Sequence, residues 1–295
     1  MKKGLLLAVG SYVSWGFLSI FWKFLGDIDS YEVFAYRIVS TLITMGLYFV
    51  LFGRLGKLKG ELTTLVHNKR ELTSMILASF LISINWIVYI YAIAHGEATA
   101  ASLGYYINPL FSVLLAVVFL KEKLNNFTKV SIFLALSGVA ILAIQGGKFP
   151  IIALILPLSF GTYGFIKKNV TLCSEVAMFV ETLVVMPFIL VFLMFFAKHS
   201  VVDYSLKQLV LLAISGIVTA IPLLLFAEAL KCAPLNVVGF VQYLNPTIQL
   251  AIAIFIFHEP FKFENIYGFM AIWVAILVFI IGQVILLKKM KKYHA

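Results

Sequence analysis

The most informative polar residues of this chain lie in two similar segments, each built around an Asn-Pro pair. Residues Gly104–Leu110 (GYYINPL) recur 137 positions later as Val241–Thr247 (VQYLNPT). Residues spaced i, i+3 and i+7 share one face of a helix, so each segment predicts a polar stripe of amides and hydroxyls. Such groups bind a small molecule by hydrogen bonding and need no covalent chemistry. The stripes are Tyr105, Asn108 and Ser112 in the first segment, and Gln242, Asn245 and Gln249 in the second.

Prolines accompany these stripes. Inside a helix, Pro109 would leave the carbonyl of Tyr105 without a donor, and Pro246 would do the same for Gln242. A freed carbonyl needs a partner in hydrocarbon, so we expect these kinks, and a third at Pro222, beside a central cavity. For either asparagine alone, a hydrogen bond to a neighbouring helix explains its presence equally well.

Further aromatic and polar residues extend the predicted cavity. Their side chains combine large apolar surfaces with hydroxyl, amide or indole groups that need partners in lipid. A pocket of this kind suits a small, partly apolar solute. The additional candidates are Ser11, Trp15, Asn85, Trp86, Tyr89, Tyr163 and Phe226.

Two ionisable residues lie deep inside apolar runs, where a charge indicates function by default. We expect Glu181 to be a proton-titrating group because no cation is evident at its depth; a neutral, hydrogen-bonded glutamate is the alternative. We expect Arg37 to extend toward the membrane surface with Glu32 as its partner. Trp22, near a helix end, is typical of an interfacial anchor.

The elements that must position these residues follow from the composition. Hydrophobic residues make up 62% of the 295 residues and charged residues 12%, against about 45–50% and about 25% in soluble proteins. Ten runs are long enough to cross about 30 Å of hydrocarbon. The all-α integral membrane fold therefore has ten predicted spans: Gly4–Leu25, Tyr31–Phe52, Leu72–Ala94, Ala98–Leu120, Phe127–Ile144, Phe149–Ile166, Ser174–Ala197, Leu206–Leu230, Leu235–Phe257 and Glu264–Leu287.

The basic residues predict the orientation of these spans. With the N-terminus inside, seventeen Lys and Arg residues fall in cytoplasmic segments and four on the opposite side, leaving Lys23 and Arg37 within the runs. This asymmetry places both termini in the cytoplasm. The longest connection, Gly53 to Glu71, is read as a basic loop. Because the cations lie between apolar runs, the net charge of +10 indicates membrane topology and not nucleic-acid binding.

The repeated segments divide the chain into two halves, 1–146 and 147–295. A second similarity, between Ser11–Phe17 and Ser159–Phe165, supports the same division. Five spans per half is an odd number, so the second half enters the bilayer from the opposite face. Such inverted repeats underlie alternating access in many secondary transporters; a purely structural duplication is the alternative.

Motifs for other activities are missing from the sequence. It contains no GxxxxGK[ST] phosphate loop, no GxSxG nucleophile elbow and no second histidine after His258-Glu259 to complete a zinc protease motif. No cofactor, metal site or catalytic residue is therefore predicted. Two other functions stay open, a membrane-embedded protein that binds or senses a ligand without moving it, and an intramembrane enzyme.

These motifs together resemble the drug/metabolite transporter superfamily, specifically the EamA family and its RarD-type (chloramphenicol-sensitivity) branch. In the first half the resemblance rests on Ser14–Gly16, Trp22–Lys23, Asn85–Trp86, Ser102–Leu110 and Glu122. In the second half it rests on Tyr163–Gly164, Glu181–Leu183, Pro222–Ala227, Gln242–Gln249 and Glu259–Pro260. The resemblance implies a permease of the bacterial inner membrane, with a cavity lined by spans one, three, four, six, eight and nine.

The expected function is therefore secondary active transport of a small organic solute, such as an amino acid, metabolite or drug, by alternating access. The expected partners are this solute, the lipid bilayer and protons. Export is the expected direction, from the resemblance alone.

Overall fold

A computed structural model describes residues 2–120, 126–146, 150–167, 170–232, 241–259, 264 and 266–293. Helices are the only regular elements within these ranges. They are α1 (Lys2–Lys23), α2 (Ser30–Leu51), α3 (Leu55–His67), α4 (Lys69–Ala94), α5 (Ala98–Leu120), α6 (Asn126–Gly146), α7 (Ile151–Lys167), α8 (Ser174–Phe195), the 3-10 turn η1 (Val201–Asp203), α9 (Leu206–Cys232), α11 (Leu244–Phe255) and α12 (Ile266–Tyr293).

Each of the ten predicted apolar runs overlaps a described helix, although residues 235–240 of the ninth run lie outside the described residues. The predicted all-α membrane fold is confirmed. Five of the described helices, namely α1, α2, α4, α8 and α9, are each long and apolar enough to cross a bilayer by themselves. The connection from Gly53 to Glu71 differs from the prediction because it contains α3. Leucines recur along one side of this helix, at Leu55, Leu58, Leu62 and Leu65, so its periodicity is helical even though it is too short to span the membrane.

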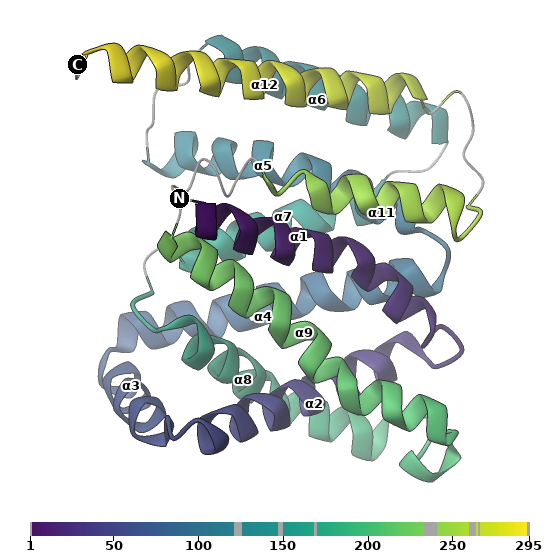
Figure 1. Cartoon of the computed structure of the whole chain (residues 1–295). Coiled ribbons are helices and arrows are strands. Elements are labelled where there is room, and N and C mark those ends of the chain that lie inside the picture. Colours follow the sequence, from purple (N-terminus) through teal and green to yellow (C-terminus); the bar gives the residue numbers. More distant parts are fainter. Residues whose placement is uncertain are drawn as a thin grey trace.

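The helices form layers with both chain termini at the same end of the bundle (Figure 1). The paired helices α6 and α12 make an outer layer beside α5, while α2, α8 and α9 lie on the far side of the molecule (Figure 1). We call the end that carries the termini the terminal end, and the other the distal end. Helix α1 ends and α2 begins at the distal end.

Packing between the halves is reciprocal. Helix α1, the first of the first half, packs on α9 and α11, the third and fourth long helices of the second half. Helix α7, the first of the second half, packs on α4 and α5, which hold the corresponding places in the first half. Three further contacts join helices that hold the same place in the two halves, namely α2 with α8, α5 with α11 and α6 with α12. This is the contact pattern of two inverted repeats.

One proline differs from its prediction. Helix α11 begins at Leu244 after a turn at Gln242 and Tyr243, so Pro246 lies in the first helical turn, where a missing N–H costs nothing. The carbonyl of Gln242 accepts a hydrogen bond from the N–H of Asn245 at 3.1 Å and is therefore not free. Pro109 and Pro222 do lie inside their helices, α5 and α9.

A large hydrophobic cluster closes the distal end. Side chains of α1, α2, α4, α5, α7, α9 and α11 contribute to it, so it joins both halves. Trp22 of α1 and Leu25, just after α1, pack there with Leu156 of α7 and Leu212 of α9, and all four are buried. Burial of apolar side chains from both halves stabilises this packing.

Candidate substrate site between the two halves

Asn85 is the centre of a polar group that joins the two halves. Its Nδ2 donates to the Oγ of Ser159 at 3.1 Å and to the carbonyl of Leu156 at 3.0 Å, both on α7. The hydroxyl of Tyr105 on α5 donates to its Oδ1 at 3.1 Å. Asn85 and Ser159 are buried, so the amide has its donors and acceptor satisfied by protein, as a polar group inside a membrane protein requires.

Gln249 forms a second polar group nearby. Its Nε2 donates to the hydroxyl of Tyr89 at 3.1 Å and to the Oδ1 of Asn245 at 2.9 Å. The rings of Tyr89 and Tyr105 meet edge to face with centroids 5.7 Å apart, which connects this group to Asn85. Asn245 and Gln249 are buried; the second predicted stripe therefore faces protein and not lipid.

Ser11 makes the repeat-related counterpart of the Asn85–Ser159 contact. Its hydroxyl donates to the carbonyl of Pro222 at 2.7 Å. Ser11 corresponds to Ser159 at an offset of 148 residues, and Asn85 corresponds to Pro222 at an offset of 137. Equivalent positions of the two halves therefore form two contacts, Ser159 with Asn85 and Ser11 with Pro222.

Trp15 and Phe226 are brought together in an aromatic group with Tyr12. The three ring centroids lie 5.5 to 5.9 Å apart, across the contact of α1 with α9. Tyr12 follows Ser11 in α1, and Phe226 lies one helical turn after Pro222 in α9. The predicted residues therefore divide between two places along the interface of the halves.

The remaining residues of the stripes have different outcomes. Asn108 is buried in α5, on the side of the helix that meets Gly161 of α7. Gln242 is half-buried in the turn before α11. The side chain of Ser112 lies outside the described residues.

Glu181 has a cation beside it, so one premise of its prediction was wrong. The Nζ of Lys167 lies 2.8 Å from its Oε1, and the hydroxyl of Tyr163 donates to the same oxygen at 3.0 Å. Lys167 is the last residue of α7 and extends along Tyr163 into the bundle. The position of Lys167 along its helix does not predict this ion pair, because a lysine side chain spans more than one helical turn.

The side chain of Arg37 lies in the interior and not near the membrane surface, where its sequence position had predicted it. Its side chain is 4% exposed and does not extend to the surface. Its Nε donates to the Oγ1 of Thr219 at 3.0 Å, and its guanidinium group lies over the rings of Trp22 and Trp86. Trp22 is buried under this group and is not an interfacial anchor. Glu32, the expected partner, binds elsewhere.

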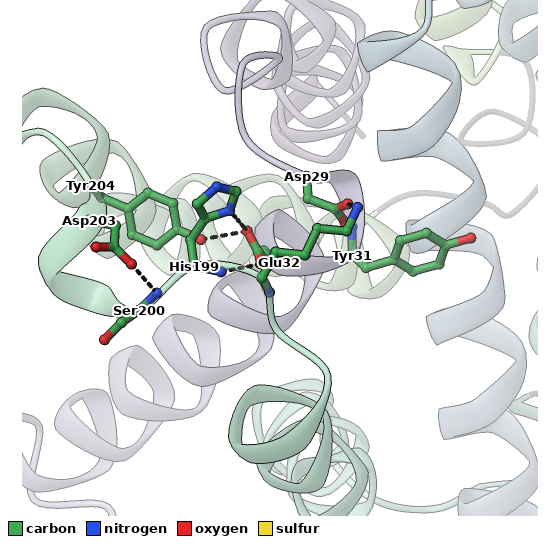
Figure 2. A network of polar contacts seen from close by, with 8 residues as sticks. Asp29, Tyr31, Glu32, His199, Ser200, Asp203 and Tyr204 are labelled. Carbon is green, nitrogen blue, oxygen red and sulfur yellow. Dashed lines mark hydrogen bonds and ion pairs between the residues drawn. The ribbon is translucent and has the colours of Figure 1, made fainter.

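Glu32 is the centre of a polar clamp at the distal end, in which α2 is joined to the segment between α8 and α9 (Figure 2). Its carboxylate accepts from the N–H groups of Lys198 and His199 at 2.6 and 3.0 Å and from the hydroxyl of Tyr204 at 2.7 Å. The His199 ring also faces it (Figure 2), with Nδ1 at 3.1 Å. Burial, and then the Glu32 carboxylate, raises the pKa of Tyr204, which therefore stays a donor.

Asp29 adds an ion pair to this distal clamp, with Lys198 Nζ at 2.8 Å from Oδ2. Burial alone would raise the pKa of Asp29, but the hydrogen bonds from Lys198 and from the N–H of Tyr31 outweigh it. The pKa therefore lies below its ordinary value. The two halves are held together here by charge as well as by hydrophobic packing.

The terminal end carries the inverted equivalent, which we call the terminal clamp. Glu175 in the first turn of α8 is paired with Arg54 at 2.9 Å and Lys57 at 3.6 Å, in the segment that follows α2. Glu71 of α4 accepts from the N–H and hydroxyl of Thr171 at 2.6 and 2.8 Å. The two clamps are therefore equivalent. At the distal end Glu32 of the first half binds the segment after α8, and at the terminal end Glu175 of the second half binds the segment after α2.

Glu259 makes a further contact between the halves at the distal end. Its carboxylate accepts from the N–H groups of Ala98 and Thr99, at 2.7 and 2.9 Å, at the start of α5. An anion at a helix N-terminus is favourable because the first N–H groups have no partner within the helix. Its repeat counterpart, Glu122, lies outside the described residues.

The described residues contain no group of three or more His, Cys, Asp or Glu side chains that could hold a metal ion. The arrangement of amides, hydroxyls and aromatic rings instead provides hydrogen-bonding and stacking surfaces of the kind that bind small organic molecules.

Comparison with known proteins agrees with this architecture. Residues 2–144 and again residues 148–281 match the EamA-like transporter family. The chain is 43% identical to the "Uncharacterized transporter YojE" of Bacillus subtilis, over 96% of this chain and 95% of that protein. It is 34% identical to "Protein RarD" of Streptomyces exfoliatus, over 94% and 88% of the two chains.

More distant relatives extend the same picture. "Protein RarD" of Escherichia coli is 29% identical over 96% of this chain and 95% of that protein. One solved crystal structure has a TM-score of 0.63 at 14% identity and covers 94% of this chain and 96% of the other, a likeness of fold alone. The full-length matches and the twice-matched family pattern show that this protein belongs to the EamA-like transporter family.

Proposed function

We propose that this protein is a secondary active transporter that moves a small organic solute across the bacterial inner membrane by alternating access. In this proposal residues 1–146 and 147–295 are the two repeat units, and both termini lie in the cytoplasm. The observation that carries it is the group around Asn85 of α4, which donates to Ser159 of the other half and accepts from Tyr105 of α5. A site made by both halves changes its access when the halves rearrange.

The proposed solute site combines amides with aromatic rings. Asn85, Tyr105 and Gln249 supply donors and acceptors, while Trp86 and Tyr89 supply apolar surfaces. In the present closed arrangement these polar groups bind one another. A solute would replace some of these contacts with its own, so that its binding compensates for opening them. The other predicted residues extend this surface, namely Ser11, Trp15, Asn108, Ser112, Tyr163, Phe226, Gln242 and Asn245.

The distal and terminal clamps are the proposed gates. Glu32 holds the distal end and Glu175 the terminal end, each through bonds to the opposite half. Alternating access requires that one end opens while the other stays closed, so the two clamps would break in turn. Each consists of a few hydrogen bonds or ion pairs, and contacts of this kind contribute about 0.5–3 kcal/mol each, small enough to exchange during transport.

Proton coupling is assigned to Glu181 in this proposal. In the present arrangement Lys167 and Tyr163 both bind its carboxylate. In this proposal the movement of α7 against α8 separates Lys167 from Glu181, and a proton takes the place of the cation. Protonation is thereby linked to the conformational change. We propose export as the direction, on the resemblance to the family alone.

Flux of labelled solutes into proteoliposomes, with and without a proton gradient, tests the proposal. We expect at least one member of a panel of amino acids and other small metabolites to cross faster than in protein-free vesicles. A proton gradient should accelerate that flux. A protein that binds a solute but never moves it would be a ligand-binding or regulatory protein, and recovery of a chemically altered product would identify an enzyme.

A further inference from the structure

Arg37 carries a positive charge inside the bundle without a matching anion. Its Nε donates to Thr219, and none of the ion pairs within 4 Å that the described residues form includes it. A buried guanidinium group is costly unless an anion or several acceptors compensate it. Its position, about 10 Å along α2 from the distal end at 1.5 Å per residue, is too deep for solvent to do so.

Aromatic rings hold the guanidinium group by its faces. Its carbon lies 4.1 Å from the centroid of Trp86 and 5.0 Å from that of Trp22. Cation–π contacts of this kind stabilise the charge by about 0.5–2 kcal/mol each. Stacking occupies the two faces, whereas the five N–H donors of arginine point outward in the plane of the group. The indole Nε1 of Trp22 is buried beside it without a hydrogen-bond partner.

The inverted repeat provides a direct comparison. Arg37 is the eighth residue of α2, and Glu181 is the eighth residue of α8, the helix of the same rank in the second half. Each half therefore places one buried charge at the same position, and the two charges have opposite sign. Glu181 has its counter-charge in the protein, because Lys167 lies 2.8 Å away.

Among the residues that the structure describes, no carboxylate forms the corresponding ion pair with Arg37. Lys167 on α7 corresponds to Ser19 on α1 at the offset of 148 that relates Ser159 to Ser11. Ser19 is buried, and its hydroxyl donates to the carbonyl of Gly16. Within the described residues, one half therefore completes its ion pair, while the other contains a buried cation with no carboxylate paired to it.

We infer that Arg37 binds a carboxylate group of the transported solute. This inference rests on the proposed function and names the class of its substrate, a small organic acid or amino acid. A carboxylate matches the planar donors of arginine and can accept two hydrogen bonds from them. Tyr89 and Tyr105 lie within electrostatic range of the guanidinium group, and the same two residues bind Gln249 and Asn85. The carboxylate is thus held where the two halves meet.

The test on the unmodified protein compares carboxylates with their uncharged counterparts. Thermal stabilisation and equilibrium binding of the purified full-length chain would be measured with pairs of ligands, such as phenylacetate with phenylacetamide and each natural L-amino acid with its amide. We expect at least one carboxylate to bind at least about tenfold more tightly than its amide. This is the difference in affinity that one charge-assisted hydrogen bond provides. If no pair shows this preference, the inference is wrong.

Variants then assign the preference to Arg37. R37Q should lose the preference for carboxylate over amide, and R37K should retain part of it because it keeps the charge. K207Q removes one exposed positive charge at the distal end and should bind like the unmodified protein. A purely structural arginine would instead lower the melting temperature in R37Q and weaken both members of each pair equally.

Flux in proteoliposomes separates this inference from the function on which it rests. A carboxylate that binds through Arg37 but does not cross the membrane would contradict transport and leave the anion site intact. A solute that crosses equally well as acid and as amide, in both R37Q and the unmodified protein, would contradict the anion site and leave transport intact.

Discussion

The amide of Asn85 donates a 3.1 Å hydrogen bond to the hydroxyl oxygen of Ser159, so that one residue from each half of the chain meets its partner in the interior. We expect Asn85→Leu to remove this contact and to leave the hydroxyl of Tyr105 without its acceptor. The loss should be about 1–3 kcal/mol of stability, with solute flux reduced at least about tenfold. Melting temperature and initial flux are the measurements.

The control for Asn85 is the preceding residue. Ile84 is exposed on the outside of α4, and Ile84→Ala should change flux little. Equal loss of flux in both variants would indicate a general sensitivity of α4 and contradict a specific role of Asn85.

Glu181→Gln should uncouple the transporter from the proton gradient. The amide is similar in size and still accepts from Tyr163, but it cannot ionise, so Lys167 loses its counter-charge. We expect about 1–3 kcal/mol lower stability and flux that no longer responds to an imposed proton gradient. The double variant K167M/E181Q should recover stability without recovering the gradient response. Flux in E181Q that responds to the gradient as in the unmodified protein would contradict coupling through this residue.

The distal clamp should weaken in acid. The pKa of Asp29 is held below its ordinary value of 3.8 by Lys198. A carboxylate with a lowered folded-state pKa contributes stability that is complete above the unfolded-state value and is lost as the pH falls through the folded-state pKa. The melting temperature should therefore fall below about pH 4, and Asp29→Asn should be less sensitive in that range. An identical decline in both proteins would show that Asp29 does not contribute.

Gly216 should not tolerate a larger side chain. A Cβ at this position would overlap the carbonyl of Ser40 on α2, whose hydroxyl also accepts from the N–H of Gly216 at 3.0 Å. We expect Gly216→Ala to cost about 1–3 kcal/mol through overpacking between α2 and α9. Gly46→Ala in α2 meets nothing within 4 Å and should be neutral or slightly stabilising. Similar melting temperatures for the two variants would contradict close contact between these helices.

Most of the fold could be predicted from the sequence because the bilayer imposes simple rules. Long apolar runs must be helices, and the Asn-Pro repeat indicates that the chain consists of two similar halves. Helix α3 was missed because it does not span the membrane, and a scan for long apolar runs does not detect an amphipathic helix of 13 residues.

The site could be predicted only in part. The sequence identified Asn85, Tyr105 and Gln249 as interior residues, and the structure places them in connected polar groups. It did not predict the surroundings of Arg37 or the Lys167–Glu181 pair. Both depend on which side chains of other helices lie alongside, and this is set by tertiary packing that periodicity along one helix does not contain.

The central claim is that the two halves open their ends alternately around a shared site. A reducible bis-maleimide cross-link across the distal clamp tests it, in a D29C/K198C variant whose two native cysteines are replaced by alanine. Asp29 and Lys198 lie 2.8 Å apart through their charged groups, so a short linker can join these positions.

Solute flux in proteoliposomes before cross-linking, after it and after reduction is the decisive measurement. The account predicts that the cross-linked protein still binds solute from the terminal end but moves none, and that reduction restores flux. Undiminished flux through fully cross-linked protein would contradict alternating access at this gate.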